Sequence, residues 1–495
     1  MCANRLLVLD PPRPHGIEPP IKAPTATSQL DGASATPGIT AQAPTPLASA
    51  PVKTRALETV VYGGTEVSAQ VLSPRTSTWL NVLTTLEVMS GRCDQQLPTH
   101  EGSAMTKNFG DFQWSVYGDA VRGISSRYPF DFESIERKAF DALPDWVYRY
   151  VSAAAGDGRT QRANIDAYSR YGIIPRMMVS PPERDLSINL FGKQLPSPMF
   201  MAPIGLIGLC SPDFYGDVAA AKASAETGVP FTLSTFSQTP MEDVIKHAGS
   251  TPNFYQLYLP GDRELAASFL DRAERSGYSS VVVTVDSWTL GYRPADLAIG
   301  NYPQARGFCM ENYYSDENFT KHLAKPPHED PAATLRYYAS IFAVPLAWED
   351  LRWIRSNTKL PVAVKGIQHP DDARLAIDNG ADVLYVTNHG GRQANSGIPT
   401  LQLLPGVIEA AGSTPVMFDG GIRSATDAVI ALALGATAIG IGRSYAYALS
   451  YGGAESLTHY LKAFLAELDL CLAICGFKDI ASLKEAGCEQ ALTFQ

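Results

Sequence analysis

The sequence predicts an α/β protein built on a (β/α)8 TIM barrel, with a long lid-like insertion after the fourth strand and a disordered N-terminal extension. Two observations predict the barrel. Short apolar, β-branched segments recur along the chain, and helical segments that end near glycine separate them. Eight such segments follow one another, as buried parallel strands do in a closed barrel. The insertion is predicted by a long stretch rich in Tyr, Pro and Asn between residues 286 and 361.

The pattern places each strand and helix in turn. The expected strands are Pro198–Pro203, Pro230–Ser234, Phe254–Leu257, Ser280–Asp286, Pro361–Lys365, Asp382–Thr387, Pro415–Asp419 and Thr437–Gly442. The helices expected between them include Asp213–Thr227, Arg263–Arg275, Asp371–Asp378 and Ala425–Leu434. Glycine stands just beyond several of these helices, where it favours the left-handed conformation that ends a helix.

The first hundred residues differ in composition from the rest. Residues 11–52 consist mainly of Pro, Ala, Thr, Ser and Gly, which bury too little apolar surface to offset the entropy lost on ordering. We therefore expect residues 1–105 to be a disordered or poorly ordered extension and residues 106–495 to form the barrel domain. Whether the extension serves as a targeting or partner-binding tail is left open.

The composition excludes several classes of function. The net charge is −10 and no dense basic block is present, which argues against binding to nucleic acid or to an anionic membrane surface. Seven scattered cysteines do not suggest a disulfide framework, and Cys471 with Cys475 lack partners for a metal site. The chain ends carry neither a secretory signal nor a peroxisomal address, so the cytoplasm is the expected location.

Two glycine loops follow the last two expected strands, and each carries an arginine. The residues are Asp419, Gly420, Gly421 and Arg423 after the seventh strand, and Gly442 and Arg443 after the eighth. Backbone N–H groups at these two positions of a barrel commonly bind a phosphate group. The alternative is a pair of tight turns with surface arginines. Together the loops predict a phosphorylated substrate or cofactor.

Charged and titratable side chains also follow the fourth, fifth and sixth expected strands. His389 follows the sixth strand, and Asp286 ends the fourth. A carboxylate beside an imidazole strengthens it as a base, although burial of the pair works in the opposite direction. Arg293 and Arg392 can together hold a carboxylate, whereas Lys365 closes an apolar strand and needs an electron-rich partner. We expect one site at this face of the barrel, with His389 as its catalytic base.

Taken together, these segments resemble the FMN-dependent family of 2-hydroxy acid oxidases and dehydrogenases. They are Gln256-Leu257-Tyr258, Thr284-Val285-Asp286, Lys365-Gly366-Ile367, Asn388-His389-Gly390-Gly391-Arg392-Gln393 and Asp419-Gly420-Gly421-Ile422-Arg423. The resemblance runs from about Phe109 to about Leu483. It implies an oxidoreductase with FMN as cofactor, acting on a small-molecule 2-hydroxy acid with oxygen, and assembled as a homo-oligomer, either a tetramer or an octamer.

The resemblance also implies a role for each candidate residue. The catalytic residues would be His389, Asp286 and Tyr258, and the substrate carboxylate would be bound by Tyr150, Arg293 and Arg392. The flavin ring and its phosphate would be held by Pro203, Ile204, Gly205, Ser234, Gln256, Thr284, Lys365, Thr387, Asp419, Gly420, Gly421, Arg423, Gly442 and Arg443. Lys365 would stabilise the reduced ring.

Further segments are similar to lactate 2-monooxygenase, a member of the same family. They include Gly110-Asp111-Phe112, Gly156-Asp157, Ala202-Pro203-Ile204-Gly205, Asn301-Tyr302-Pro303-Gln304 and Arg392-Gln393-Ala394-Asn395. The expected reaction is oxidation of a lactate-like L-2-hydroxy acid to the 2-keto acid, with electrons passed to oxygen and with coupled decarboxylation. Gly205 stands where family oxidases tend to have alanine, and the room it leaves favours retention and decarboxylation of the keto acid.

Two positions depart from the family pattern. Tyr150 is followed by Val151-Ser152-Ala153-Ala154-Ala155, without the usual glycine, and Thr387 replaces a serine while keeping the hydroxyl. Two alternatives stay open. The substrate could be a larger secondary metabolite, or the chain could be a non-redox phosphate-binding barrel that uses only the glycine loops. Carbanion and hydride mechanisms are not distinguished by sequence.

Overall fold

The computed structural model describes residues 59–62, 65–68, 108–179, 181–342 and 344–494. Residues 108–494 lie in one compact unit, and a hairpin of β1 (Thr59–Tyr62) and β2 (Thr65–Ser68) lies in another. Apart from that hairpin, the predicted extension up to residue 105 falls outside the described residues. The barrel domain is therefore the part whose architecture can be compared with the sequence.

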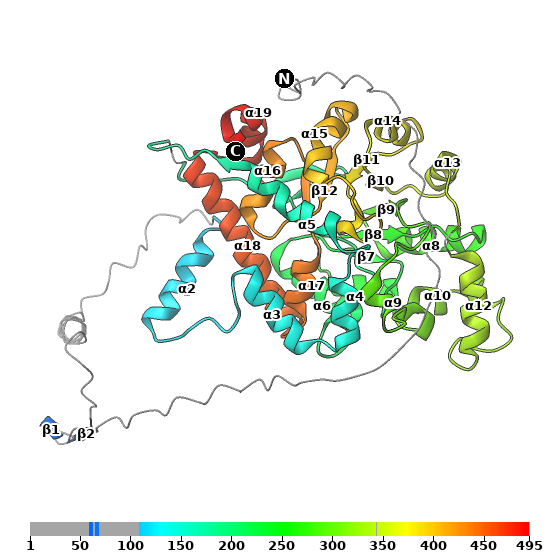
Figure 1. The fold of residues 1–495 in the computed structure, drawn as a ribbon, viewed down its shortest axis with the longest axis horizontal. Helices are drawn as coiled ribbons and strands as arrows, with labels where there is room; N and C mark the ends of the chain where they lie inside the picture. Colours follow the sequence, from blue (N-terminus) through cyan, green and yellow to red (C-terminus); the bar gives the residue numbers. More distant parts are fainter. Residues whose placement is uncertain (1–58, 63–64, 69–107, 180, 343, 495) are drawn as a thin grey trace, which may run out of the picture. The chain divides into compact units, whose positions relative to one another are not determined.

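Eight parallel strands at the centre of this unit confirm the predicted barrel (Figure 1). They are β6 (Met199–Met201), β7 (Thr232–Ser234), β8 (Phe254–Leu257), β9 (Ser280–Thr284), β10 (Val362–Ile367), β11 (Val383–Val386), β12 (Val416–Asp419) and β13 (Ala438–Ile441). Strands adjacent in the chain pair with each other, and β13 also pairs with β6. A parallel bridge between Met201 and Phe231 closes the ring between β6 and β7.

Four strands that were predicted to begin at a proline start after that proline. Prolines at positions 198, 230, 361 and 415 precede β6, β7, β10 and β12, respectively. Proline has no backbone N–H to donate to a neighbouring strand, so the ladder begins after it. The apolar run is thus longer than the strand that it forms.

Helices surround the strands and follow the predicted alternation (Figure 1). They are α6 (Gly216–Thr227), α7 (Met241–Ile245), α8 (Arg263–Ser276), α13 (Trp348–Ser356), α14 (Pro370–Asp378), α15 (Thr400–Ala411), α16 (Ala425–Ala433), α17 (Arg443–Leu449) and α18 (Gly453–Cys475). Gly228 and Gly277 end α6 and α8 in the left-handed conformation, as expected. The sequence pattern gave no bounds for helices after the last strand, where α17 and α18 lie.

Further elements lie outside the eight strands and their helices. Before it come α2 (Asp111–Val121), α3 (Phe132–Ala142), α4 (Asp145–Ser152), α5 (Arg159–Asp166) and η1 (Ala167–Arg170). The strands β3 (Tyr171–Ile173) and β14 (Leu492–Phe494) pair, and α19 (Ile480–Ala491) leads into β14. The hairpin of β4 (Ile188–Leu190) and β5 (Lys193–Leu195) packs Leu190 and Leu195 into one cluster with Phe254 and Val383, which begin β8 and β11. The hairpin therefore closes the barrel at the N-terminal ends of its strands.

The insertion between β9 and α13 is made of short helices. They are α9 (Pro294–Leu297), η3 (Pro303–Arg306), α10 (Glu311–Tyr314), α11 (Glu317–Thr320) and α12 (Pro331–Ile341). Short helices gain little from their own hydrogen bonds, so the insertion must be held by contacts with the barrel. No helix within the described ranges is long and apolar enough to cross a membrane.

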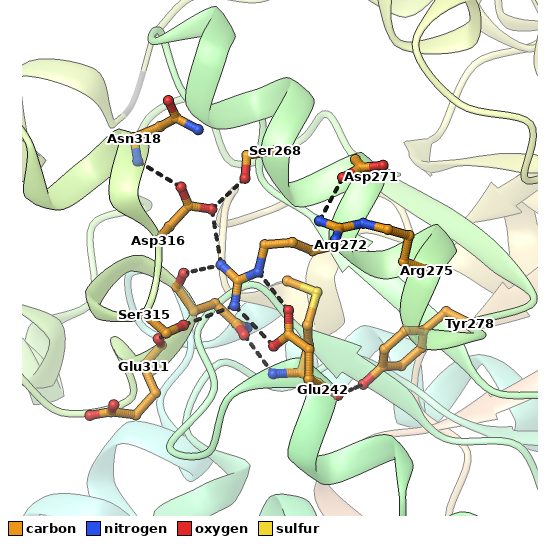
Figure 2. Close-up of polar contacts among 12 residues, drawn as sticks. Glu242, Ser268, Asp271, Arg272, Arg275, Tyr278, Glu311, Ser315, Asp316 and Asn318 are labelled. Atoms are coloured by element: carbon orange, nitrogen blue, oxygen red, sulfur yellow. Dashed lines mark hydrogen bonds and ion pairs between the residues drawn. The ribbon is translucent and has the colours of Figure 1, made fainter.

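Arg272 of α8 provides such contacts (Figure 2). Its Nε and Nη2 donate to the two carboxylate oxygens of Glu242 on α7, at 2.7 and 3.0 Å. Its Nη1 and Nη2 also reach the insertion, donating to Asp316 Oδ2 at 3.0 Å, to the backbone oxygen of Asn312 at 2.8 Å and to Ser315 Oγ at 2.8 Å. Since Arg272 is buried, this network fixes α10 and α11 against two barrel helices.

Candidate active site

Two cavities meet at the C-terminal ends of the strands. Of the predicted site residues, the inner cavity is lined by Tyr150, Pro203, Ile204, Gly205, Tyr258, Lys365, His389, Arg392, Asp419, Gly420, Gly421, Arg423, Gly442 and Arg443. The outer cavity is lined by Arg293 and by residues of the insertion. Tyr150, Gly205, Tyr258 and His389 line both. These four residues therefore lie at the boundary between the two cavities.

His389 is held in one orientation by its Nδ1 atom. This atom lies 2.8 Å from Asp286 Oδ1 and 3.1 Å from Ser287 Oγ. The hydroxyl of Ser287 also donates to Asp286 Oδ1, so the carboxylate accepts from both neighbours. With an Nδ1–H donated to the carboxylate, the lone pair of the neutral ring lies on Nε2, which is free to accept a proton.

The backbone at His389 adopts an uncommon conformation. Its φ is +57°, and the two following glycines also have positive φ. The backbone N–H of His389 donates to Thr387 Oγ1, whose hydroxyl donates to Asp419. A non-glycine residue in the left-handed region costs free energy that surrounding contacts must offset, and such residues cluster at functional sites. Thr387 and Asp419 thus support the position of the imidazole.

Burial and charge act in opposite directions on the His389–Asp286 pair. The side chains expose only 17% and 6% of their surface, respectively. Burial lowers the pKa of His389 below its ordinary value, and this effect exceeds the opposing attraction of Asp286. Burial alone would raise the pKa of Asp286, but the neighbouring His389 and Lys365 hold it well below its usual range. At neutral pH the site therefore holds a neutral imidazole beside an ionised carboxylate.

Two arginines bring positive charge to the same place. Arg392 lies over the ring of Tyr150, 4.8 Å from its centroid, and donates from Nη1 to the backbone oxygens of Tyr150 and Ala153. Its Nη2 is buried without a partner among the described residues. Burial and the nearby Arg293 lower the pKa of Arg392 to about 10. A bound carboxylate would offset the repulsion and accept from the unpaired Nη2.

The two glycine loops form the other end of the inner cavity. Gly421 has a φ of +82°, and a Cβ atom there would lie 2.1 Å from the backbone oxygen of Asn164. Only glycine fits such a close approach. Arg423 lies against this loop with its Nε buried and unpaired, and burial lowers its pKa. The loop therefore offers backbone and guanidinium donors for an anion.

Arg443 faces the same cavity but is more fully bound than the sequence suggested. Its Nε, Nη1 and Nη2 donate to the backbone oxygens of Val151, Gly390 and Ala153. Burial and the charge of Arg392 lower its pKa to about 9. These carbonyl contacts set the path of the backbone after Tyr150, where the sequence lacks the usual glycine. Arg443 thus supplies charge to the cavity while most of its N–H groups stay bound to the protein.

Buried polar atoms at the ends of β8 and β9 have no hydrogen-bond partner among the described residues. Ser234 Oγ donates to Gln256 Oε1 at 2.9 Å, which leaves Gln256 Nε2 as a free donor. Thr284 Oγ1 is also unpaired. The ammonium of Lys365 lies 5.4 Å from the centroid of the Tyr385 ring and has no hydrogen bond to any described residue. Buried polar atoms in folded proteins are nearly always hydrogen-bonded, so these indicate a missing ligand.

Comparison with known proteins decides which ligand this is. The model of the family described as FMN-dependent dehydrogenase matches residues 139–490. The chain belongs to the FMN-dependent dehydrogenase family.

Individual relatives agree with this membership. The chain is 35% identical over 382 residues to an FMN-dependent alpha-hydroxy acid dehydrogenase of Penicillium citrinum, covering 76% of this chain and 94% of that one. It is 35% identical over 367 residues to an L-lactate oxidase of Lysinibacillus sphaericus, covering 74% and 94%. Among solved structures, a lactate oxidase of Pediococcus acidilactici matches with a TM-score of 0.66 and 30% identity, covering 74% and 95%.

FMN-dependent oxidation of a 2-hydroxy acid is therefore the activity class of this chain, and the non-redox barrel is set aside. The unpaired atoms described above fit FMN. A flavin ring has nitrogen and oxygen acceptors for Gln256, Thr284 and Lys365, and a phosphate accepts from the loops and from Arg423. Pro203, Ile204 and Gly205 line the same inner cavity and would contact a flavin ring bound there.

Some contributing residues were not recognised from the sequence. Ser287 is a second partner of His389 Nδ1, and only its position beside Asp286 hinted at it. Gln393 accepts from Arg293 Nη2 at 2.9 Å and donates to the backbone oxygen of Asp286 at 2.7 Å. It links the loops after β9 and β11. Such a link depends on which side chains meet in space, and no local pattern reveals it.

Proposed function

We propose that this enzyme oxidises an L-2-hydroxy acid to the 2-keto acid and passes the electrons to oxygen. The observation that carries the proposal is the position of His389, which is held by Asp286 and lines two adjoining cavities, one containing Arg392 and the other Arg293. The cations suit a substrate carboxylate, and the base suits the adjacent hydroxyl-bearing carbon. The carboxylate and the adjacent hydroxyl-bearing carbon are common to lactate and every other 2-hydroxy acid.

The protein's own residues carry the proton and bind the substrate. Arg392 and Arg293 hold the carboxylate, and Tyr150 packs under the Arg392 guanidinium. His389 Nε2 takes one proton from the substrate, and Asp286 stabilises the imidazolium that results. Bound FMN supplies the acceptor for the two electrons. The reaction balances as loss of two protons and two electrons from the substrate, which oxygen takes up to give hydrogen peroxide.

Gly205 bears on the fate of the keto acid. A Cβ atom at this position would lie 3.4 Å from Phe236 Cδ2, an ordinary contact, and its φ is not in the left-handed region. The glycine thus leaves space between the two cavities that alanine would fill without strain. We propose that the keto acid stays there and reacts with peroxide, so that pyruvate and hydrogen peroxide would give acetate, carbon dioxide and water.

Product analysis under air tests both parts. The holoenzyme is given L-lactate or a larger L-2-hydroxy acid, and keto acid, decarboxylated acid and peroxide are measured. We expect decarboxylated acid from the natural chain and a shift toward keto acid and free peroxide in Gly205→Ala. Stoichiometric keto acid and peroxide from the natural chain would reject the decarboxylation, while failure of every 2-hydroxy acid to react would reject the oxidation itself.

A further inference from the structure

The outer cavity is larger than the reacting unit of a 2-hydroxy acid requires. Its volume is about 440 Å³. Its polar lining includes His389, Tyr258 and Arg293 on the side of the inner cavity, together with Ser287, Asp296, Asn301 and Gln304. The large apolar and aromatic residues of the lining, which we call the apolar wall, are Phe236, Leu290, Leu297, Tyr302 and Phe342. A substrate with only a methyl group at C2, such as lactate, would leave most of this wall without a partner.

Aromatic rings dominate the inner part of the apolar wall. The ring of Phe236 lies 5.3 Å from that of Tyr258 and 5.5 Å from that of Phe342, measured between centroids. The hydroxyl of Tyr302 lies 2.9 Å from that of Tyr338, so its polar end is already satisfied. Because these rings line the cavity, an aromatic group inside it would pack against ring surfaces.

The outer part of the wall is apolar surface in contact with water. Leu290 is 49% exposed and Leu297 is 58% exposed, and both belong to the segment that follows β9. A single exposed leucine needs no explanation, but two at the mouth of a catalytic cavity mark a surface that a ligand can cover.

We propose that this site takes 2-hydroxy acids whose C2 carries an aromatic side chain, with L-3-phenyllactate as the model compound. The proposal rests on the proposed function, because the carboxylate and the hydroxyl are bound as described above. The carbon chain then places the ring among Phe236, Tyr302 and Phe342, with the leucines covering its outer edge. Each added methylene buried in this way raises the specificity constant about fourfold.

Anaerobic reduction of the bound flavin tests the inference without dependence on oxygen. The holoenzyme is mixed with L-lactate, L-2-hydroxyisocaproate or L-3-phenyllactate, and bleaching of the flavin absorbance is followed. We expect phenyllactate to exceed lactate at least about 100-fold in apparent second-order rate constant, with hydroxyisocaproate between them. A lactate rate equal to that of phenyllactate overturns the inference and leaves the proposed function intact. No bleaching by any of the three overturns both.

Variants of the apolar wall separate substrate recognition from folding. Leu297→Asn removes apolar surface from the wall, and Leu375→Asn is a matched control on α14, where the side chain is 40% exposed and lines neither cavity. We expect Leu297→Asn to raise the KM for phenyllactate about tenfold with little change in kcat, and to leave lactate kinetics unchanged. Equal effects on both substrates, or an unchanged KM for phenyllactate, would overturn the role of the wall.

Discussion

Replacing Asp286 by asparagine tests how much its charge contributes to the base. The carboxylate oxygen lies 2.8 Å from His389 Nδ1, and the amide oxygen of asparagine can still accept the same hydrogen bond. Only the charge is lost. At this distance and an effective dielectric constant of about 20, the attraction to an imidazolium is about 6 kcal/mol at most. The net contribution of a hydrogen bond to a charged group is smaller, about 1.5–3 kcal/mol.

Asp286→Asn would destabilise the transition state, in which His389 carries the proton, by about this amount. Flavin reduction would then slow about 10- to 150-fold. Stopped-flow mixing of the anaerobic holoenzyme with substrate measures this rate directly. Ser287→Ala is the matched control, because it removes the other partner of Nδ1 and keeps the charge. We expect it to slow reduction only about fivefold. A rate for Asp286→Asn within twofold of the natural chain would refute the role given to the carboxylate.

Four further predictions follow from the structure. His389→Gln should keep the flavin spectrum while flavin reduction by substrate slows about 10²- to 10⁴-fold, and a near-natural rate would show that another group is the base. Because burial lowers the pKa of His389, the midpoint at which kcat/KM falls on the acid side should lie below pH 6.5, and a midpoint above 6.5 would contradict the assignment. Arg272→Met removes the countercharge of buried Asp316 and should lower the free energy of unfolding by about 3–5 kcal/mol in urea titrations, whereas Arg275→Met, exposed on the same helix, should change it little. Burial raises the pKa of Asp217 from 3.8 to about 6, so the folded state binds this proton more tightly than the unfolded state does. This proton contributes about 3 kcal/mol of stability below pH 4, and the contribution is lost as pH rises through 6. In Asp217→Asn the free energy of unfolding, measured from pH 4 to 7, should lack this pH-dependent decrease.

The barrel was predictable because its strands are buried on both faces. Segments such as Val281–Val283 and Val383–Val386 read as continuous apolar runs, and only the paired part of each run was uncertain. The meeting of His389 with Asp286 also followed from topology, because parallel strands place their C-terminal ends at one face of the barrel. The bounds of the helices after the last strand could not be predicted from the sequence, because an apolar helix can pack anywhere on the outside of the barrel.

Other features of the site depend on long-range geometry. The presence of a carboxylate beside His389 was predictable, but whether burial or charge prevails in its pKa depends on how much water reaches the pair. Arg443 was expected to bind phosphate, and its hydrogen bonds to backbone oxygens of residues 151, 153 and 390 became visible only with the folded chain. The contacts of Arg272 join residues 30 to 44 positions apart and have no sequence signature.

The Arg272 network also bears on how such an enzyme can diverge (Figure 2). Its attachment points on the insertion, Asn312, Ser315 and Asp316, lie apart in the chain from Leu290 and Leu297, which line the cavity mouth. Substitutions at these two leucines can therefore alter the cavity mouth while the anchor of the insertion stays unchanged. A change of specificity at this mouth then need not weaken the attachment of the insertion to the barrel.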